Sequence, residues 1–151
     1  MKTKYIAHEY KLVKLRECPV RCLCDNPKSA SAYWRRHVTS HPLYNPDVEC
    51  VVVVMLNIRR KIIGHHLVST GTLDTCLVGA REVFRLAIVQ NAAAILLMHN
   101  HPSGDPLPSD SDVKVTRDMV RAGALLKIEL CDHVIVGSGR KYASLKELGY
   151  L

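Results

Sequence analysis

The sequence contains no hydrophobic run that is long enough to cross a membrane as a helix. Its longest apolar runs, residues 51–56 and 92–98, are far shorter than the roughly 20 residues that a spanning helix needs. The basic residues at the start, Met1 to Tyr5, are not followed by the apolar stretch of a secretory signal. We therefore expect a cytoplasmic protein with no membrane partner.

Internal repeats and low-complexity tracts are also absent, and the composition is that of a globular protein, with 48% hydrophobic and 23% charged residues. A chain of 151 residues is long enough to bury a core within one domain. We place a basic N-terminal extension over residues 1–25 and a single domain over residues 26–151.

The six cysteines lack the paired Cys-x-x-Cys arrangement of a zinc ribbon. Three of them lie in apolar or strand-like surroundings and are expected to be small buried side chains: Cys50, Cys76 and Cys131. Cys18, Cys22 and Cys24 form a cluster, with His37 and His41 further along. Their spacing does not match a structural zinc site, so reduced thiols are the simpler interpretation.

The net charge of +7 is concentrated near the N-terminus. Residues 1–36 contain nine lysines and arginines against three acidic residues, whereas the remaining 115 residues contain twelve against eleven. A basic segment before a near-neutral domain is compatible with a polyanionic partner such as nucleic acid. A solvated surface with scattered lysines explains the same count, so both interpretations stay open.

Apolar periodicity, caps and turn residues predict alternating helices and strands. The predicted helices cover residues 27–38, 79–90 and 110–123, with a short final helix capped by Ser144. The predicted strands cover residues 49–56, 62–69, 92–98, 128–136 and 141–143, with residues 4–15 as an added edge strand. This mixture predicts an α/β fold with a mixed sheet flanked by helices.

The most informative stretch is HNHPSGDPLPSDSD, residues 99–112, which lies between a predicted buried strand and a predicted helix. Residues i and i+2 of an extended segment point to the same side, so His99 and His101 can converge. Prolines and a glycine then force a loop, and Ser109 begins the next helix with Asp112 in its first turn. Two imidazoles and a carboxylate form the three-ligand site of catalytic zinc, with a fourth position for water.

Each part of this stretch also has a simpler interpretation. Ser109-x-x-Asp112 is a helix-capping pattern, and a His-x-His pair can be two polar side chains on a strand. The strand, the proline-rich loop and the helix occur together, however, and this context favours a metal site over two unrelated features. Asn100 and Ser103 are interpreted as residues that shape the loop.

The spacing His-x-His, seven residues, Ser, two residues, Asp resembles the JAMM signature of MPN/JAB-domain metalloproteins. The sequence of residues 99–112 is similar to sequences of the RadC-type branch of that family, as are residues 81–84, 90–94 and 131–137. The resemblance covers residues 49–151 well. It implies an MPN/JAB fold related to the cytidine-deaminase architecture, with Zn²⁺ as cofactor and a peptide or isopeptide bond as substrate.

Hydrolysis at such a site needs a carboxylate that can move a proton from the attacking water. The resemblance places the catalytic glutamate of JAMM proteins at Glu49, at the start of a predicted central strand. Glu82 is the other candidate, although a salt bridge to a neighbouring arginine explains it equally well. The resemblance also places Ser109 beside the tetrahedral intermediate, where its hydroxyl could donate a hydrogen bond to the oxyanion.

Two further pairs of residues contain histidine. Asp132 and His133 lie in the last long strand. They either contact a metal ligand and orient it, or form a buried pair with each other. His65 and His66 are neighbours on a predicted strand, so they point to opposite faces and are not expected to share a metal.

Two classes of function therefore remain. The first is a zinc-dependent hydrolase that acts on a peptide or protein. A zinc deaminase is excluded, since the sequence has neither Pro-Cys-x-x-Cys nor His-x-Glu. The second is a DNA-associated accessory protein, which the DNA-repair label of RadC-type proteins and the basic N-terminal segment support. The substrate and the oligomeric state cannot be derived from these residues.

Overall fold

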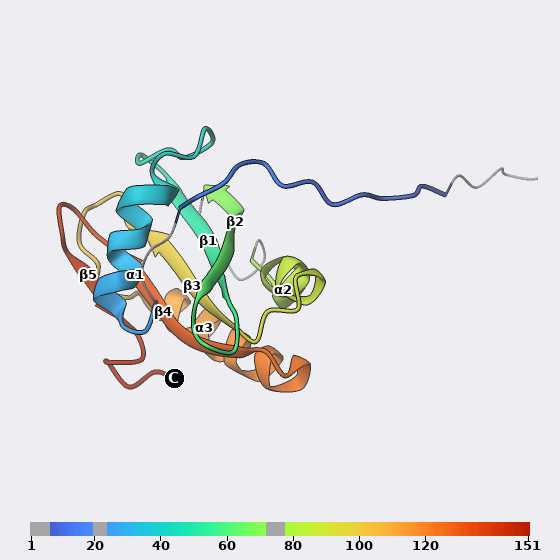
Figure 1. Cartoon of the computed structure of the whole chain (residues 1–151). Helices are drawn as coiled ribbons and strands as arrows, with labels where there is room; N and C mark the ends of the chain where they lie inside the picture. The colour runs from blue at the N-terminus through green and yellow to red at the C-terminus, as the bar shows by residue number, and fades with distance from the viewer. Residues whose placement is uncertain (1–6, 20–23, 72–77) are drawn as a thin grey trace, which may run out of the picture.

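A mixed five-stranded sheet with helices on both faces forms the body of the protein (Figure 1). The computed structural model describes residues 7–19, 24–71 and 78–151. The strands are β1 (Glu49–Leu56), β2 (Ile62–Gly71), β3 (Ala94–Asn100), β4 (Glu129–Val136) and β5 (Tyr142–Ser144). The helices are α1 (Pro27–Tyr33), which continues into the π-helical turn η1 (Trp34–Val38), α2 (Ala80–Val89) and α3 (Asp110–Leu126). The predicted fold class, a mixed sheet flanked by helices, is confirmed.

The order of strands across the sheet is β2-β1-β3-β4-β5, so β3 lies at the centre. β1 runs antiparallel to both β2 and β3, whereas β3 and β4 are parallel and are connected through α3. Every residue of β3 is buried, which explains why its sequence is an almost continuous apolar run rather than an alternating one.

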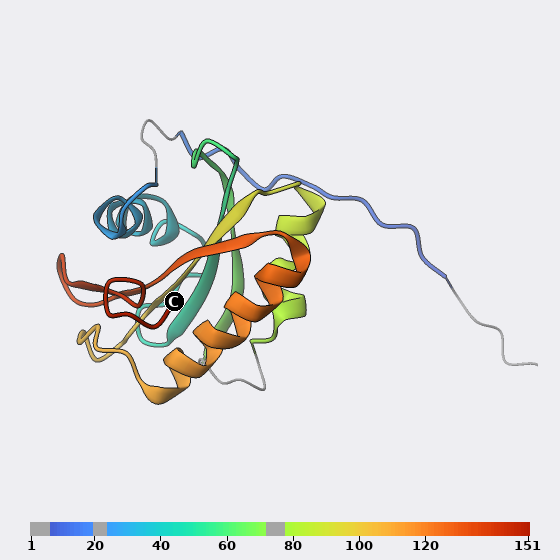
Figure 2. The same cartoon turned by 90° about the horizontal axis from the view of Figure 1, so that it is seen from below.

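The two faces of the sheet are covered by different helices, as Figure 2 shows with α2 and α3 on one side and α1 on the other. Side chains alternate between the faces along each strand. Val51 and Leu97 pack in the core under α2 and α3, whereas Val52 and Met98 pack with Trp34 in the core under α1 and η1.

A β-bulge in β4 changes which face its later residues occupy. Ile95 of β3 is paired with Leu130, but the next residue, Leu96, is paired with Asp132, so Cys131 is an extra residue. Leu130 packs in the core under α2 and α3. Without the bulge, simple alternation would place His133 on the opposite face from Leu130. The extra residue instead turns His133 toward α3.

Two predicted elements are absent from the described residues, and the bounds of others differ; β3 covers Ala94–Asn100 rather than the predicted residues 92–98. Residues 7–15 form no strand, and residues 4–6 of that predicted edge strand lie outside the described residues. Residues 145–149 form turns rather than a helix, although the Ser144 hydroxyl accepts a hydrogen bond from the Glu147 N–H at 3.0 Å. α3 continues past Gly123 to Leu126, and the missing side chain of Gly123 leaves room for the Ile128 carbonyl and Phe84.

In the part of the chain that the structure describes, no helix combines the length and the apolar character that crossing a membrane requires.

Candidate metal centre

The candidate metal centre lies where β3 ends and α3 begins. His99 is the second-last residue of β3, and its side chain is 0% exposed on the face that α2 and α3 cover. His101 follows the strand end, and a loop over residues 102–108 leads to α3. Asp112 lies in the first turn of α3 and is 2% exposed. The short connection between strand and helix therefore returns the carboxylate to the two imidazoles.

Three donor atoms converge at this point. His99 Nε2 lies 3.0 Å from His101 Nε2 and 3.2 Å from Asp112 Oδ1, and His101 Nε2 lies 3.4 Å from Asp112 Oδ2. Ligands at about 2.0–2.1 Å from a tetrahedral zinc ion lie about 3.3–3.5 Å from one another. The structure thus brings the three predicted side chains together, with one ligand atom of each residue within 4.8 Å of the others, and they are the one group among the described residues that could hold a metal.

The outer nitrogen of His101 has a partner that determines where the ring hydrogen lies. His101 Nδ1 is 2.8 Å from the backbone carbonyl oxygen of Asp105. A carbonyl only accepts hydrogen bonds, so Nδ1 must carry the hydrogen. In the neutral ring, the lone pair of Nε2 is then directed toward His99 and Asp112, as metal ligation requires.

Charge around the centre favours a cation. Burial alone would raise the pKa of Asp112, but hydrogen bonds from His101 and His99 outweigh burial and hold that pKa well below its usual value. The hydrogen bond to Asp112 in turn raises the pKa of His101, and the charge of Glu49 adds to this effect. The ionised carboxylate therefore favours positive charge in the space between it and the two imidazoles.

The capping interpretation of Ser109 and Asp112 is also correct. The Ser109 hydroxyl accepts a hydrogen bond from the Asp112 N–H at 3.2 Å, and Asp112 Oδ2 accepts one from the Ser109 N–H at 2.7 Å. The Ser109 hydroxyl also donates to Asp112 Oδ2 at 2.7 Å. This capping box orients the carboxylate so that its other oxygen, Oδ1, faces His99.

The two candidate glutamates lie in different environments. Glu49 is the first residue of β1, and Val51, two residues later on the same face, is paired with His99. This register places Glu49 on the face of β1 that His99 shares, and the charge of Glu49 contributes to the raised pKa of His101. Glu82 lies in the first turn of α2, where its carboxylate folds back over Gly79. Among the described residues, no hydrogen bond or ion pair connects Glu82 to His99 or His101.

Asn100 has a role that differs from the predicted shaping of the loop. It is the last residue of β3 and is 5% exposed. Its side-chain oxygen accepts from the Cys50 N–H at 2.8 Å, and its side-chain nitrogen donates to the Val48 carbonyl at 3.0 Å. Asn100 thus holds the backbone on both sides of Glu49. The only sequence signal for this role is a polar residue at the end of an apolar strand.

The predicted pair of Asp132 and His133 does not exist as a side-chain contact. The His133 ring lies between His99 Nδ1, at 2.8 Å, and Thr116 Oγ1, at 2.6 Å, and burial holds its pKa well below the usual value. Asp132 accepts hydrogen bonds from the Ser144 hydroxyl and from two backbone N–H groups, and burial raises its pKa. Of these two residues, only His133 contacts a candidate ligand, and the two side chains do not pair with each other.

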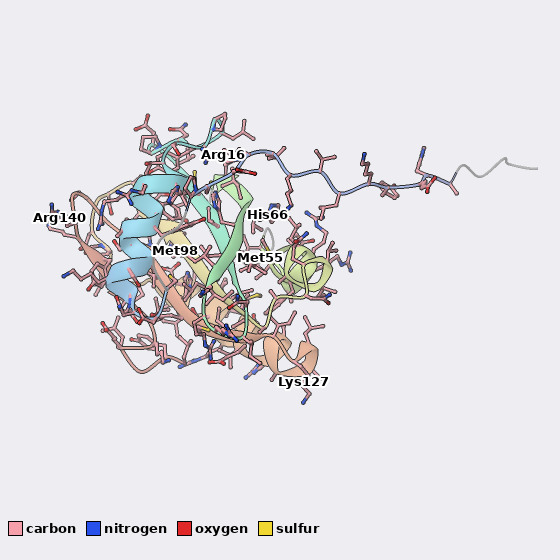
Figure 3. All side chains as sticks on the ribbon, viewed as in Figure 1. Arg16, Met55, His66, Met98, Lys127 and Arg140 are labelled. Atoms are coloured by element: carbon pink, nitrogen blue, oxygen red, sulfur yellow. The ribbon has the colours of Figure 1, made fainter. Side chains whose placement is uncertain are left out.

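His65 and His66 point to opposite sides of β2, as predicted. His65 Nδ1 is 2.7 Å from the Tyr33 hydroxyl of α1, and burial lowers the pKa of His65 to about 4. His66 is paired with Val53, which packs under α2, and lies on the α2 side of the strand (Figure 3).

The cysteines of the described ranges, Cys18, Cys24, Cys50 and Cys131, form no disulfides. Cys50 is buried as predicted, whereas Cys131 is half-buried and accepts a hydrogen bond from Arg60. Cys22 and Cys76 lie outside the described residues, so the expectation for the Cys18–Cys24 cluster stays a prediction.

The mixed sheet, with this group of residues at the end of its central strand, defines the protein as an α/β domain of the JAB type. The family model described as "RadC-like JAB domain" matches residues 24–150. The chain belongs to this family, as its resemblance to RadC-type sequences predicted.

Curated relatives agree with this assignment. The chain is similar to a UPF0758 protein of Caldanaerobacter subterraneus subsp. tengcongensis, with 55% identity over 98 residues, which are 65% of this chain and 42% of the relative. A UPF0758 protein of Desulfitobacterium hafniense is 42% identical over 143 residues, covering 82% of this chain and 63% of the relative. One of Moorella thermoacetica is 50% identical over 105 residues, covering 70% and 45%. The matches thus span about half the length of these relatives.

Replacement of Asn100 with alanine is expected to destabilise the domain by about 2–4 kcal/mol, because it leaves the Cys50 N–H and the Val48 carbonyl without their buried partner. Denaturant unfolding measures this change. Gln90→Ala, at an exposed position, is the control and should change the free energy of unfolding by less than about 0.5 kcal/mol. Equal stabilities of the two variants would contradict the role of Asn100 in holding the backbone on both sides of Glu49.

Proposed function

We propose that this domain is a zinc-dependent hydrolase that cleaves a peptide or isopeptide bond. The observation that carries the proposal is the convergence of two imidazole nitrogens and a buried carboxylate, with one ligand atom of each residue within 4.8 Å of the others and the Nδ1 hydrogen of His101 on the side away from the centre. Positive charge between these groups is favourable, and two imidazoles with one carboxylate are the ligands of catalytic zinc.

His99, His101 and Asp112 would hold the metal. When bound there, zinc would supply acidity to a coordinated water and polarise the carbonyl of the substrate. The capping box keeps Asp112 Oδ1 directed at this position, and the Asp105 carbonyl keeps the lone pair of His101 Nε2 directed there. The chain therefore arranges its ligands before a metal binds, which limits the ordering cost of binding.

Glu49 is the proposed general base and acid. A carboxylate beside the centre can accept a proton from the attacking water and pass it to the leaving amine. Glu49 is half-buried at the start of β1, and Asn100 holds the residues before and after it. The contribution of its charge to the raised pKa of His101 favours it over Glu82 for this role.

Ser109 is the proposed hydrogen-bond donor to the oxyanion of the tetrahedral intermediate. Its hydroxyl lies 2.7 Å from Asp112 Oδ2, at the edge of the centre. The hydrogen of this hydroxyl is donated to Asp112 in the structure, so the proposed role requires the hydroxyl to turn toward the substrate.

Elemental analysis of the purified chain tests the metal site directly. We expect about one zinc ion per chain in the wild type and none in Asp112→Ala, because a three-ligand site that loses its carboxylate binds metal far more weakly. Ser109→Ala is the matched control. It removes the same helix cap, at a cost of about 1 kcal/mol, but keeps all three ligands and should keep the metal. A wild-type chain without metal would contradict the proposal.

Glu49→Gln should keep the zinc ion but lower peptidase or isopeptidase activity by about 10²–10⁴-fold, since an amide cannot shuttle the proton. Activity is measured on a panel of peptide and isopeptide substrates with the zinc-loaded chain. Glu82→Gln is the control and should be nearly as active as the wild type. Full activity of Glu49→Gln together with an inactive Glu82→Gln would transfer the role to Glu82.

A second candidate function, association with DNA, is favoured by the basic residues near the N-terminus. Residues 7–17 are exposed and form an extended segment that leads away from the sheet and helices (Figure 1), and they include Lys11 and Lys14. If they contact phosphates, binding to a DNA duplex should weaken steeply as salt rises, and Lys11→Glu with Lys14→Glu should lower both the affinity and its salt dependence. Binding unaffected by these substitutions would contradict this contact.

A further inference from the structure

A chain of buried hydrogen bonds leads from the candidate ligand His99 into the interior. His99 Nδ1 lies 2.8 Å from His133 Nε2, and His133 Nδ1 lies 2.6 Å from Thr116 Oγ1. The Thr116 hydroxyl is also 2.7 Å from the backbone carbonyl oxygen of Asp112, one turn earlier in α3. The side chains of His99, His133 and Thr116 are each 0% exposed, so water cannot replace any of these contacts.

The direction of every hydrogen bond in this chain follows from its last member. The Asp112 carbonyl can only accept, and an oxygen–oxygen distance of 2.7 Å requires a hydrogen between the two atoms. The Thr116 hydroxyl must supply that hydrogen, since it is the only donor of the two. Thr116 Oγ1 then has no hydrogen left for His133, so His133 Nδ1 must donate to it.

The position of this hydrogen determines the state of both imidazoles. When His133 carries a single ring hydrogen, the contact with Thr116 places this hydrogen on Nδ1. His133 Nε2 is therefore an acceptor, and His99 Nδ1 must donate to it. When His99 carries a single ring hydrogen, this hydrogen lies on Nδ1, and Nε2 has a lone pair on the side of His101 and Asp112.

We propose that Thr116 and His133 are positioning residues that hold His99 in the tautomer that binds metal. This inference rests on the proposed function, because it concerns a ligand of the proposed zinc ion. Without the Thr116 hydroxyl, His133 can adopt its other tautomer and donate to His99 Nδ1. The ring hydrogen of His99 then lies on Nε2 and must be displaced before a metal can bind.

The same hydrogen-bond chain is connected to a second candidate ligand, Asp112. Asp112 contributes its side chain to the centre and its backbone carbonyl to the end of the hydrogen-bond chain. One turn of α3 therefore positions both a carboxylate and, through Thr116 and His133, an imidazole. The bulge in β4 is what turns His133 toward this helix, while Asp132 is held on the other side by Ser144.

Two variants of Thr116 separate the hydroxyl from the shape of the side chain. Thr116→Val keeps the branched shape and removes the hydroxyl, whereas Thr116→Ser keeps the hydroxyl. Zinc affinity is measured by competition with a chromophoric chelator. We expect Thr116→Val to bind zinc about 10–100-fold more weakly than the wild type, and Thr116→Ser to restore affinity to within a few-fold.

The tautomer itself is measured by two-bond proton–nitrogen spectra of the histidine rings in the metal-free wild type and in Thr116→Val. We expect His133 to carry its hydrogen on Nδ1 in the wild type and to lose this preference in Thr116→Val. A general loss of packing would lower the thermal stability of the valine variant without producing this specific change.

The outcomes separate this inference from the proposed function. Equal zinc affinity of the wild type and Thr116→Val, or a wild-type His133 with its hydrogen on Nε2, overturns the role of Thr116 and His133 alone. A wild type that shows the expected tautomer but binds no zinc overturns the proposed hydrolase instead.

Discussion

The pairing of β3 with β1 on one side and with β4 on the other determines where the strand residues of the candidate centre lie. These two ladders bury β3 completely, so polar side chains at its end need partners from neighbouring elements. The ladder with β1 places Glu49 on the same face of the sheet as His99, and the ladder with β4 brings His133 behind His99. A shift of one residue in either ladder would turn these side chains to the opposite face.

The buried polar groups around the centre form a connected network rather than separate pairs. Asp112 contacts Ser109 and the histidines through its side chain and Thr116 through its carbonyl. Such a network holds the donor atoms in place, because each buried group would lose a hydrogen bond if it moved. It also leaves three donor atoms that face one another, and positive charge between them is favourable. The same buried hydrogen bonds therefore hold the polar side chains in place and direct them toward the proposed metal.

Much of the centre could be predicted from the sequence because its signals are local. The convergence of His99 and His101 follows from strand geometry, and the position of Asp112 follows from the helix start at Ser109. Predictions that depend on distant partners were less successful. Residues 7–15 alternate in polarity but form no strand, since a strand requires a neighbour to supply its hydrogen bonds. The Ser144 pattern produced its local cap contact but not a helix.

The sequence by itself determined the types of donor at the centre and their spacing along the chain, because the period of a strand and the first turn of a helix depend only on nearby residues. The placement of Glu49 on the same face of the sheet as His99 depends on tertiary structure, since it follows from the register between β1 and β3. The tertiary structure also decided that His133 faces the centre while Asp132 faces away. The extra residue Cys131 in β4 reverses the alternation there, and this bulge exists only in the pairing of β4 with β3.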